Sequence, residues 1–134
     1  IVLKEKILFW LKENGYSFVD KGCYSADSVD YPDYALKVAE SVVENSSKGI
    51  LVCGSGIGVS IVANKVQGIR AALCSSVQMA KLSRMHNDAN VLCLGERLTK
   101  EKNALLMVKA FLKTEFEGDR HQRRVDKIHQ LTGK

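Results

Sequence analysis

The residues with the clearest chemical potential form one short segment at positions 53–58, a cysteine followed by a glycine-rich loop. They are Cys53, Gly54, Ser55, Gly56, Ile57 and Gly58. The apolar run before this segment predicts a strand at 50–53, and the pattern after it predicts a helix at 59–66. Glycine lets the backbone approach a ligand, and the N–H groups at a helix N-terminus attract phosphate or an oxyanion. A thiol beside these amides indicates a candidate active site, and the alternative is a tight turn with a buried cysteine.

A second group of candidate residues is basic and lies near the C-terminus. Its members are Arg120, His121, Arg123, Arg124, Lys127 and Lys134. A helix would place Arg120 and Arg124 on one face, where both guanidinium groups can bind phosphate. The same charges fit a solvated helix face or nucleic acid, but no recognisable nucleic-acid motif and no interleaved aromatic residues accompany them. We therefore rank nucleic acid behind a small phosphorylated substrate.

The elements around these residues alternate between helix and strand. Short apolar runs at 50–53, 69–74 and 91–94 predict buried parallel strands, and 17–20 is a further short strand candidate. Helical patterns are predicted at 3–11, ended by Gly15, from Pro32 to 42, at 77–85, and at 104–112 with a cap near Thr99. This order predicts an α/β fold, a doubly wound, three-layer α/β/α parallel sheet of the Rossmann-like type.

Composition predicts one domain that spans residues 1–134. The chain has 134 residues, of which 46% are apolar and 26% charged, and a formal net charge of +5. No apolar run approaches the roughly 20 residues that span a bilayer, and the start lacks a signal-peptide pattern. The four cysteines, Cys23, Cys53, Cys74 and Cys93, form no C-x-x-C pair, which favours free thiols in a reducing compartment. We therefore expect a cytoplasmic protein without a membrane partner.

Several further segments accompany the cysteine loop in an ordered set. They are Asp30-Tyr31-Pro32, Ala63-Asn64-Lys65, Gly68-Ile69-Arg70-Ala71, residues 82–91 (LSRMHNDANV) and residues 117–125 (EGDRHQRRV). Together with residues 53–60 they resemble ribose-5-phosphate isomerase B, a sugar-phosphate isomerase family that also includes the galactose-6-phosphate isomerase subunits. The match covers essentially the whole chain in order, which makes it more specific than any single motif.

This resemblance implies an aldose-ketose isomerase that interconverts D-ribose 5-phosphate and D-ribulose 5-phosphate through an enediolate, without a metal or other cofactor. By resemblance, Cys53 is the base that moves the proton between C2 and C1. The loop amides of residues 54–58 bind the enediolate oxygens, and the Ser55 hydroxyl helps to move the proton between O1 and O2. His86 opens the sugar ring, and Asn87 contacts the substrate hydroxyls or the enediolate. Taken alone, Ser55 also fits a bond within its own turn, and His86 a capping or solvated residue.

The resemblance also implies how the phosphate is bound and how the chain assembles. Arg120 and Arg124 are expected to bind the phosphate, with Tyr31 and Arg97 as further substrate-binding residues. In this family the helical segment at about 119–134 reaches across a dimer, so the resemblance implies a site built from two subunits, and we expect a homodimer or a tetramer. An apolar stripe of Val125, Ile128 and Leu131 is expected at the interface.

One departure from the family concerns the start of the chain. Ile1 begins within a helical pattern that has no capping residue before it, so we expect an opening strand of about ten residues upstream. The family's opening strand ends in an Asp-His pair that lines the active site, and no such pair occurs near Ile1.

Two other functions remain open. One is an isomerase of a six-carbon sugar phosphate, such as allose 6-phosphate or galactose 6-phosphate. The other is a non-catalytic phosphosugar-binding protein, in which the glycine loop and the arginines would suffice.

Overall fold

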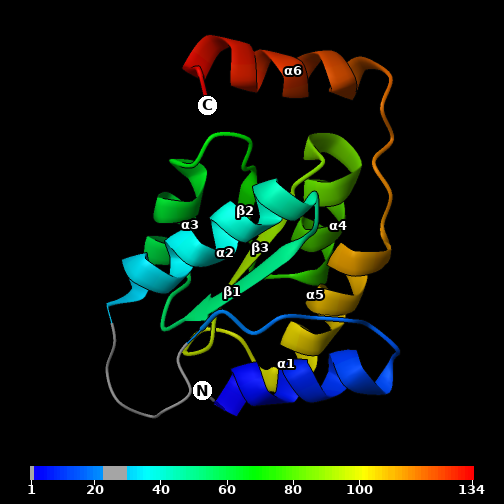
Figure 1. Cartoon of the computed structure of the whole chain (residues 1–134). Coiled ribbons are helices and arrows are strands. Elements are labelled where there is room, and N and C mark those ends of the chain that lie inside the picture. Colours follow the sequence, from blue (N-terminus) through cyan, green and yellow to red (C-terminus); the bar gives the residue numbers. More distant parts are fainter. Residues whose placement is uncertain (1, 23–29) are drawn as a thin grey trace.

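The fold is that of a computed structural model of the chain, and the structure describes residues 2–22 and 30–134. Cys23 therefore lies outside the described residues. Within them, helices and strands follow one another around a small sheet (Figure 1). In chain order they are α1 (Val2–Glu13), α2 (Tyr31–Asn45), β1 (Gly49–Cys53), α3 (Ile57–Asn64), β2 (Ala71–Leu73), α4 (Val77–Asn87), β3 (Val91–Gly95), α5 (Glu101–Lys113) and α6 (Arg120–Thr132).

The described strands form a parallel sheet in the order β1-β3-β2. Gly49 is paired with Val91 and Cys53 with Gly95, so β1 and β3 are in register over their whole length. β2 is shorter than the predicted 69–74 strand, because it pairs with β3 only over three residues. The helices α3 and α4 make the crossovers that parallel neighbours require. The expected doubly wound α/β arrangement is confirmed.

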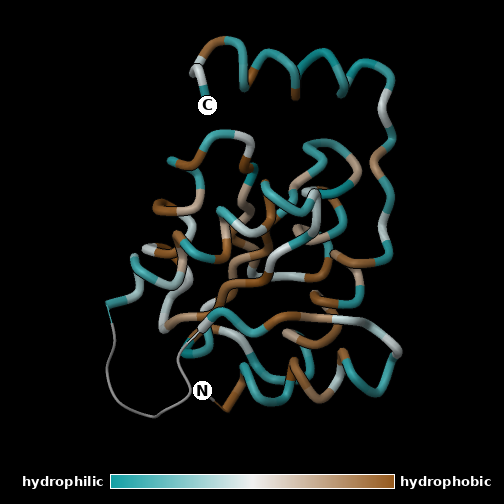
Figure 2. Tube along the Cα trace, in the orientation of Figure 1, coloured by the Kyte–Doolittle hydropathy of each residue, from teal (hydrophilic) through white to brown (hydrophobic). Residues whose placement is uncertain are grey.

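Alternation along β3 divides the core into two layers. Leu92 and Leu94 contribute to one apolar cluster with α1, α4 and α5, whereas Val91 and Cys93 contribute to another with α2 and α3. Successive side chains of a strand point to opposite faces, so one fully buried strand supplies both clusters. Figure 2 shows the mainly apolar trace of the sheet with helices on both sides of it.

The predicted strand at 17–20 is wrong, since these residues have no strand structure. They lie across a groove from the outer edge of β1, and this groove has a volume of about 1510 Å³. A strand needs a neighbouring backbone at about 4.8 Å. Within residues 2–22 and 30–134, β1 pairs only with β3, so its other edge faces the groove. We call this space the β1 groove.

The C-terminal helix α6 lies across one end of the domain, joined to α5 by an extended segment (Figure 1). Arg70 Nη1 lies 2.8 Å from His129 Nε2, and the Gly68 N–H donates to the Lys134 carbonyl. Val125 is buried against the chain itself, whereas Ile128 and Leu131 of the predicted apolar stripe are exposed. No described helix has the length and apolar character that crossing a membrane requires.

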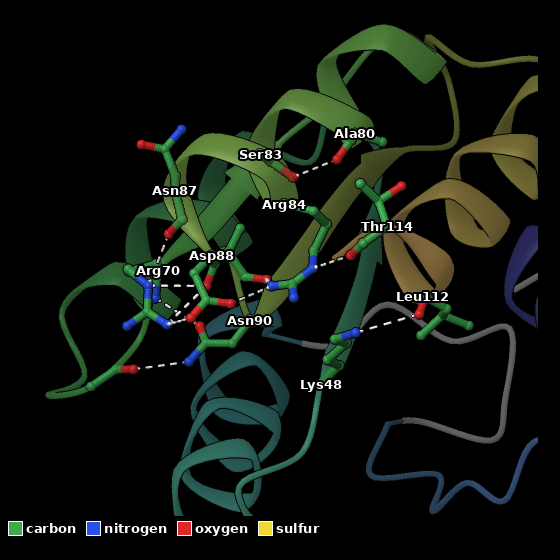
Figure 3. Close-up of polar contacts among 12 residues, drawn as sticks. Lys48, Arg70, Ala80, Ser83, Arg84, Asn87, Asp88, Asn90, Leu112 and Thr114 are labelled. Atoms are coloured by element: carbon green, nitrogen blue, oxygen red, sulfur yellow. Dashed lines mark hydrogen bonds and ion pairs between the residues drawn. The ribbon is translucent and has the colours of Figure 1, made fainter. Parts of the chain in front are cut away.

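Polar contacts hold the C-terminal end of α4 in place (Figure 3). The buried Arg84 guanidinium donates to the carbonyls of Ala89 and Thr114 at 2.7 and 3.1 Å, and to the Asp88 carboxylate at 2.8 Å. Arg70 donates to the Asp88 carbonyl from the other side. Asp88, at φ 46°, ends the helix in the left-handed conformation. These contacts fix the last turn of α4, which contains His86 and Asn87.

Candidate active site

Cys53 ends β1, and the glycine loop turns back so that its amides meet the thiol. The Gly56 N–H donates to Cys53 Sγ at 3.2 Å. Gly56 is the N-cap of α3 with φ 78°, and a Cβ there would lie 2.6 Å from Leu73 Cδ1 and 2.9 Å from the carbonyl carbon of Leu94. Glycine is therefore required at this turn. The thiol lies beside the partial positive charge of the α3 N-terminus, which favours an anionic ligand or intermediate.

Two more of the predicted site residues, Tyr31 and Arg97, lie against this loop. A Cβ at Gly58 would overlap the Tyr31 ring, so glycine allows the start of α2 to pack on the start of α3. The Arg97 guanidinium lies 3.3 Å from the position that a Cβ on Gly54 would take, and the Arg97 N–H donates to the Gly54 carbonyl at 3.0 Å. Because Arg97 is always charged, it adds a fixed cation beside the loop amides.

The loop residues line the β1 groove. Its lining includes Cys53, Gly54, Ser55, Ile57 and Gly58 together with Tyr31 and Arg97. Ser55 Oγ accepts from the Ile57 N–H at 3.2 Å, so its hydroxyl can still donate to a ligand. Six other predicted residues thus line the same groove as the partly buried Cys53 thiol.

The described thiols differ in their surroundings. Cys53 is partly exposed, whereas Cys74 and Cys93 are buried. Burial raises the pKa of Cys74 to about 11 and the pKa of Cys93 to about 12. Both therefore remain neutral thiols in the core, and the thiol available for chemistry in the described structure is Cys53.

His86 and Asn87 lie at the opposite end of the sheet from Cys53. Cys53 is at the carboxyl end of β1, whereas α4 runs back to the amino end of β3. The Asn87 carbonyl accepts from Arg70 Nε at 3.0 Å just before β2 begins. A strand rises about 3.3 Å per residue, so the five residues of β1 alone place these ends about 13 Å apart. Within one described chain, His86 does not meet Cys53.

His86 instead belongs to a cluster with Glu117 and His121. The two imidazole rings are stacked, with centroids 4.3 Å apart and planes 11° apart. Glu117 Oε1 lies 3.7 Å from His86 Nε2 and 3.5 Å from His121 Nε2. Burial lowers the pKa of His121, and the charges of His86 and Arg120 act in the same direction, so the neutral ring is favoured.

The predicted phosphate-binding residues Arg120 and Arg124 lie at this second end of the molecule. They are in the first turns of α6, as the spacing of four predicted, and both are exposed. α6 packs against α4 through the His86–His121 stack, which places both arginines on the same side as His86. The structure therefore divides the predicted residues into a thiol group and a histidine-arginine group.

Glu117 had no predicted role in the site, and His121 was named only as a member of the basic group near the C-terminus. Both lie in the segment 117–125, and a spacing of four is a signal for proximity on a helix. Glu117 lies before α6, however, and its N–H donates to the Met85 carbonyl of α4 at 3.1 Å. This long-range contact places Glu117 beside His86.

The chain is similar to known proteins over most of its length. A model of the Ribose/Galactose Isomerase family matches residues 1–128. Ribose-5-phosphate isomerase B from Escherichia coli is 47% identical over 128 residues, which cover 95% of this chain and 86% of that protein.

Solved structures are similar over the same extent. Ribose-5-phosphate isomerase B from Clostridium thermocellum matches with a TM-score of 0.95 and 51% identity, covering 98% of this chain and 89% of that one. The Mycoplasma genitalium ribose-5-phosphate isomerase B with bound ribulose-5-phosphate matches with a TM-score of 0.96 and 45% identity, covering 100% and 90%.

Proposed function

Because this chain belongs to the Ribose/Galactose Isomerase family, we propose that it interconverts D-ribose 5-phosphate and D-ribulose 5-phosphate. The observation that carries the proposal is the Cys53 thiol, which accepts a hydrogen bond from the Gly56 N–H at the start of α3 and lines the same groove as Tyr31 and Arg97. The similar Mycoplasma genitalium structure contains ribulose-5-phosphate, the ketose of this reaction. Phosphosugar binding by this similar protein therefore supports the proposal.

The reaction needs a base and a site for developing negative charge. Cys53 takes the proton from C2 of the open-chain aldose and returns it to C1, so the carbonyl group moves from C1 to C2. The amides of residues 54–58 donate to the enediolate oxygens, where charge appears during the reaction. The Ser55 hydroxyl moves the accompanying proton between O1 and O2. These steps use the chain's own groups and no metal.

Ring opening and phosphate binding fall to the histidine-arginine group. His86 opens the ring by donating a proton to the ring oxygen as the O1 hydroxyl loses its proton and C1 becomes the aldehyde. Asn87 binds sugar hydroxyls, and Arg120 and Arg124 bind the phosphate through charge-assisted hydrogen bonds. Because these residues lie at the far end of the sheet from Cys53, we propose a homodimer in which each site combines Cys53 of one copy with His86 of the other. Ile128 and Leu131, exposed on α6, supply apolar contact for the assembly.

A turnover assay without added metal tests the thiol. We expect Cys53→Ala to lower kcat by at least about a hundredfold, the lower range for loss of a general base, while ribulose 5-phosphate still binds. Cys74→Ala is the matched control, because that thiol is buried in a different apolar cluster from the one against which Cys53 packs. Unchanged turnover in Cys53→Ala would exclude the thiol as the base, and binding without turnover in the unmodified chain would support the phosphosugar-binding alternative.

Mixing two inactive variants tests the shared site. A Cys53→Ala chain and a His86→Ala chain each lack one group, but a hybrid dimer has one site with both groups intact. Random exchange of subunits makes half of the dimers hybrids, and one of the two sites in each hybrid works. We therefore expect about a quarter of normal activity. If each site is built within one chain, no hybrid can recover activity.

The family description also supports a second substrate class. Because the matching model covers ribose and galactose isomerases, six-carbon sugar phosphates are candidate substrates for the same thiol and loop. Comparison of kcat/KM for ribose 5-phosphate, allose 6-phosphate and galactose 6-phosphate decides which is preferred.

A further inference from the structure

The His86–Glu117–His121 cluster contains more ligating groups than proton exchange at the sugar ring requires. We propose that these three side chains form a site for a borderline transition-metal ion, with Zn²⁺ or Co²⁺ as the probe, and that occupation of this site inhibits the enzyme. The inhibitory part rests on the proposed function, since it requires His86 to act in turnover. The binding part rests on the geometry alone.

The distances agree with one ion bound by all three residues. Zinc bonds to nitrogen and oxygen are about 2.1 Å, so two ligand atoms of a tetrahedral ion are about 3.4 Å apart. Glu117 Oε1 is 3.7 Å from His86 Nε2 and 3.5 Å from His121 Nε2. One ligand atom from each residue lies within 4.8 Å of the others. Movements of a few tenths of an ångström satisfy the two carboxylate distances.

The two rings must also turn, because they are nearly parallel and a metal lies in the plane of each imidazole that binds it. The His86 side chain is 38% exposed and has space to rotate, whereas His121 is 10% exposed and is held in place. Glu117 is anchored next to His86 through its N–H bond to Met85. His121 therefore provides a fixed ligand, and the partly exposed side chains of Glu117 and His86 adjust to complete the site.

The charges around the cluster determine which ions bind. Arg120 and Arg124 are close enough to His121 to oppose its protonation, and they oppose a cation in the same way. Glu117 is the only carboxylate in the ligand set, so ions that prefer oxygen ligands, such as Mg²⁺, gain little here. Imidazole nitrogen is a favourable ligand for Zn²⁺, Co²⁺ and Ni²⁺, and the free energy of these bonds offsets the repulsion from the local positive charge. Partial exposure of His86 and Glu117 provides an entry path from solvent.

Bound metal would occupy the Nε2 lone pair of His86. A coordinated imidazole cannot exchange a proton at that atom, so inhibition needs no change in the thiol loop. Reversal by a chelator follows, because no covalent bond forms.

Cobalt titration of the unmodified chain tests the binding. Absorption bands of Co²⁺ bound to nitrogen and oxygen are expected, and saturating Mg²⁺ should not displace them. Loss of even an outer-shell partner costs a metal site about 10- to 100-fold in affinity, so His121→Asn and Glu117→Gln should each weaken binding by at least about tenfold. His129→Asn is the matched control, a histidine of the same helix that contacts Arg70. Equal Co²⁺ affinity in all three variants would overturn the site.

A thiol site is distinguished in the same titration. Cys53→Ser should retain the cobalt bands, and a thiolate charge-transfer band that persists in His121→Asn would assign the metal to cysteine and overturn the proposal. In the isomerase assay, Zn²⁺ should inhibit turnover and EDTA should restore it. The Glu117→Gln variant should need at least about tenfold more Zn²⁺ than the unmodified chain for the same fractional inhibition, with each rate taken relative to that protein's own metal-free rate. Zn²⁺ inhibition unchanged in Glu117→Gln would contradict the inhibitory role. An inactive protein that still binds Co²⁺ through His121 would instead refute the proposed function and leave the metal site standing.

Discussion

At the scale of single residues, the environments of the described cysteines predict which thiol reacts. Iodoacetamide reacts with thiolates. With pKa values raised by burial to about 11 and about 12, Cys74 and Cys93 deprotonate only as the pH approaches those values. At pH 8 we expect alkylation at Cys53 and protection by ribulose 5-phosphate, measured by intact mass and peptide mapping in a Cys23→Ser background. Labelling of native Cys74 or Cys93 at pH 8 would contradict this prediction.

Gly56 provides a second prediction at this scale. Gly56→Ala adds left-handed strain and places a Cβ 2.9 Å from the Leu94 backbone, which cannot move away as a flexible side chain can. We expect the free energy of unfolding in urea to fall by about 2 to 4 kcal/mol and turnover to fall with it. Gly15→Ala is the matched control, because its φ is 79° and no described atom lies within 4 Å of its Cβ position. It should lose only about 1 kcal/mol. Equal losses in the two variants would show that packing around Gly56 is loose.

At the scale of elements, Arg84 joins the end of α4 to the end of α5. Arg84→Met keeps the buried stem but removes the donors to the Ala89 and Thr114 carbonyls. We expect a loss of about 2 to 4 kcal/mol in urea unfolding, because two partly or fully buried acceptors lose their charged partner. Arg84→Lys should recover part of this loss, since one ammonium group cannot reproduce the guanidinium fork. Arg123 is exposed, so the free energy of unfolding of Arg123→Met should stay within about 0.5 kcal/mol of that of the unmodified chain. A loss in Arg123→Met as large as that in Arg84→Met would show that Arg84 has no special role.

At the scale of the whole molecule, the separation of the thiol group from the histidine-arginine group predicts that activity depends on assembly. Ile128→Glu places a charge on the exposed face of α6, where the dimer is proposed to form. We expect a mass near one chain by light scattering and a parallel loss of turnover, since charge at an apolar interface opposes association. Leu106→Glu on α5, with nearly the same exposure, is the control and should keep the unmodified chain's mass. A fully active monomer would refute the shared site.

Local chemistry explains which parts of this protein could be predicted from the sequence. The strand-loop-helix unit at Cys53 follows from an apolar run, three glycines and a helical period, which act within about fifteen neighbouring residues. The helical spacing of Arg120 and Arg124 is likewise local and is confirmed. The strand at 17–20 was wrong because β structure requires a partner backbone, and the described β1 edge faces a groove instead.

Long-range packing decided the rest. The placement of Tyr31 and Arg97 on the glycine loop depends on how α2 and the loop after β3 meet α3, which no local pattern contains. The His86–Glu117–His121 cluster depends on the docking of α6 and the segment before it on α4. The sequence by itself therefore determined the chemistry available, a thiol in an amide loop and cationic groups for phosphate. Only the tertiary structure decided that these groups lie at opposite ends of a parallel sheet, because crossover helices return the chain to the end from which each strand began.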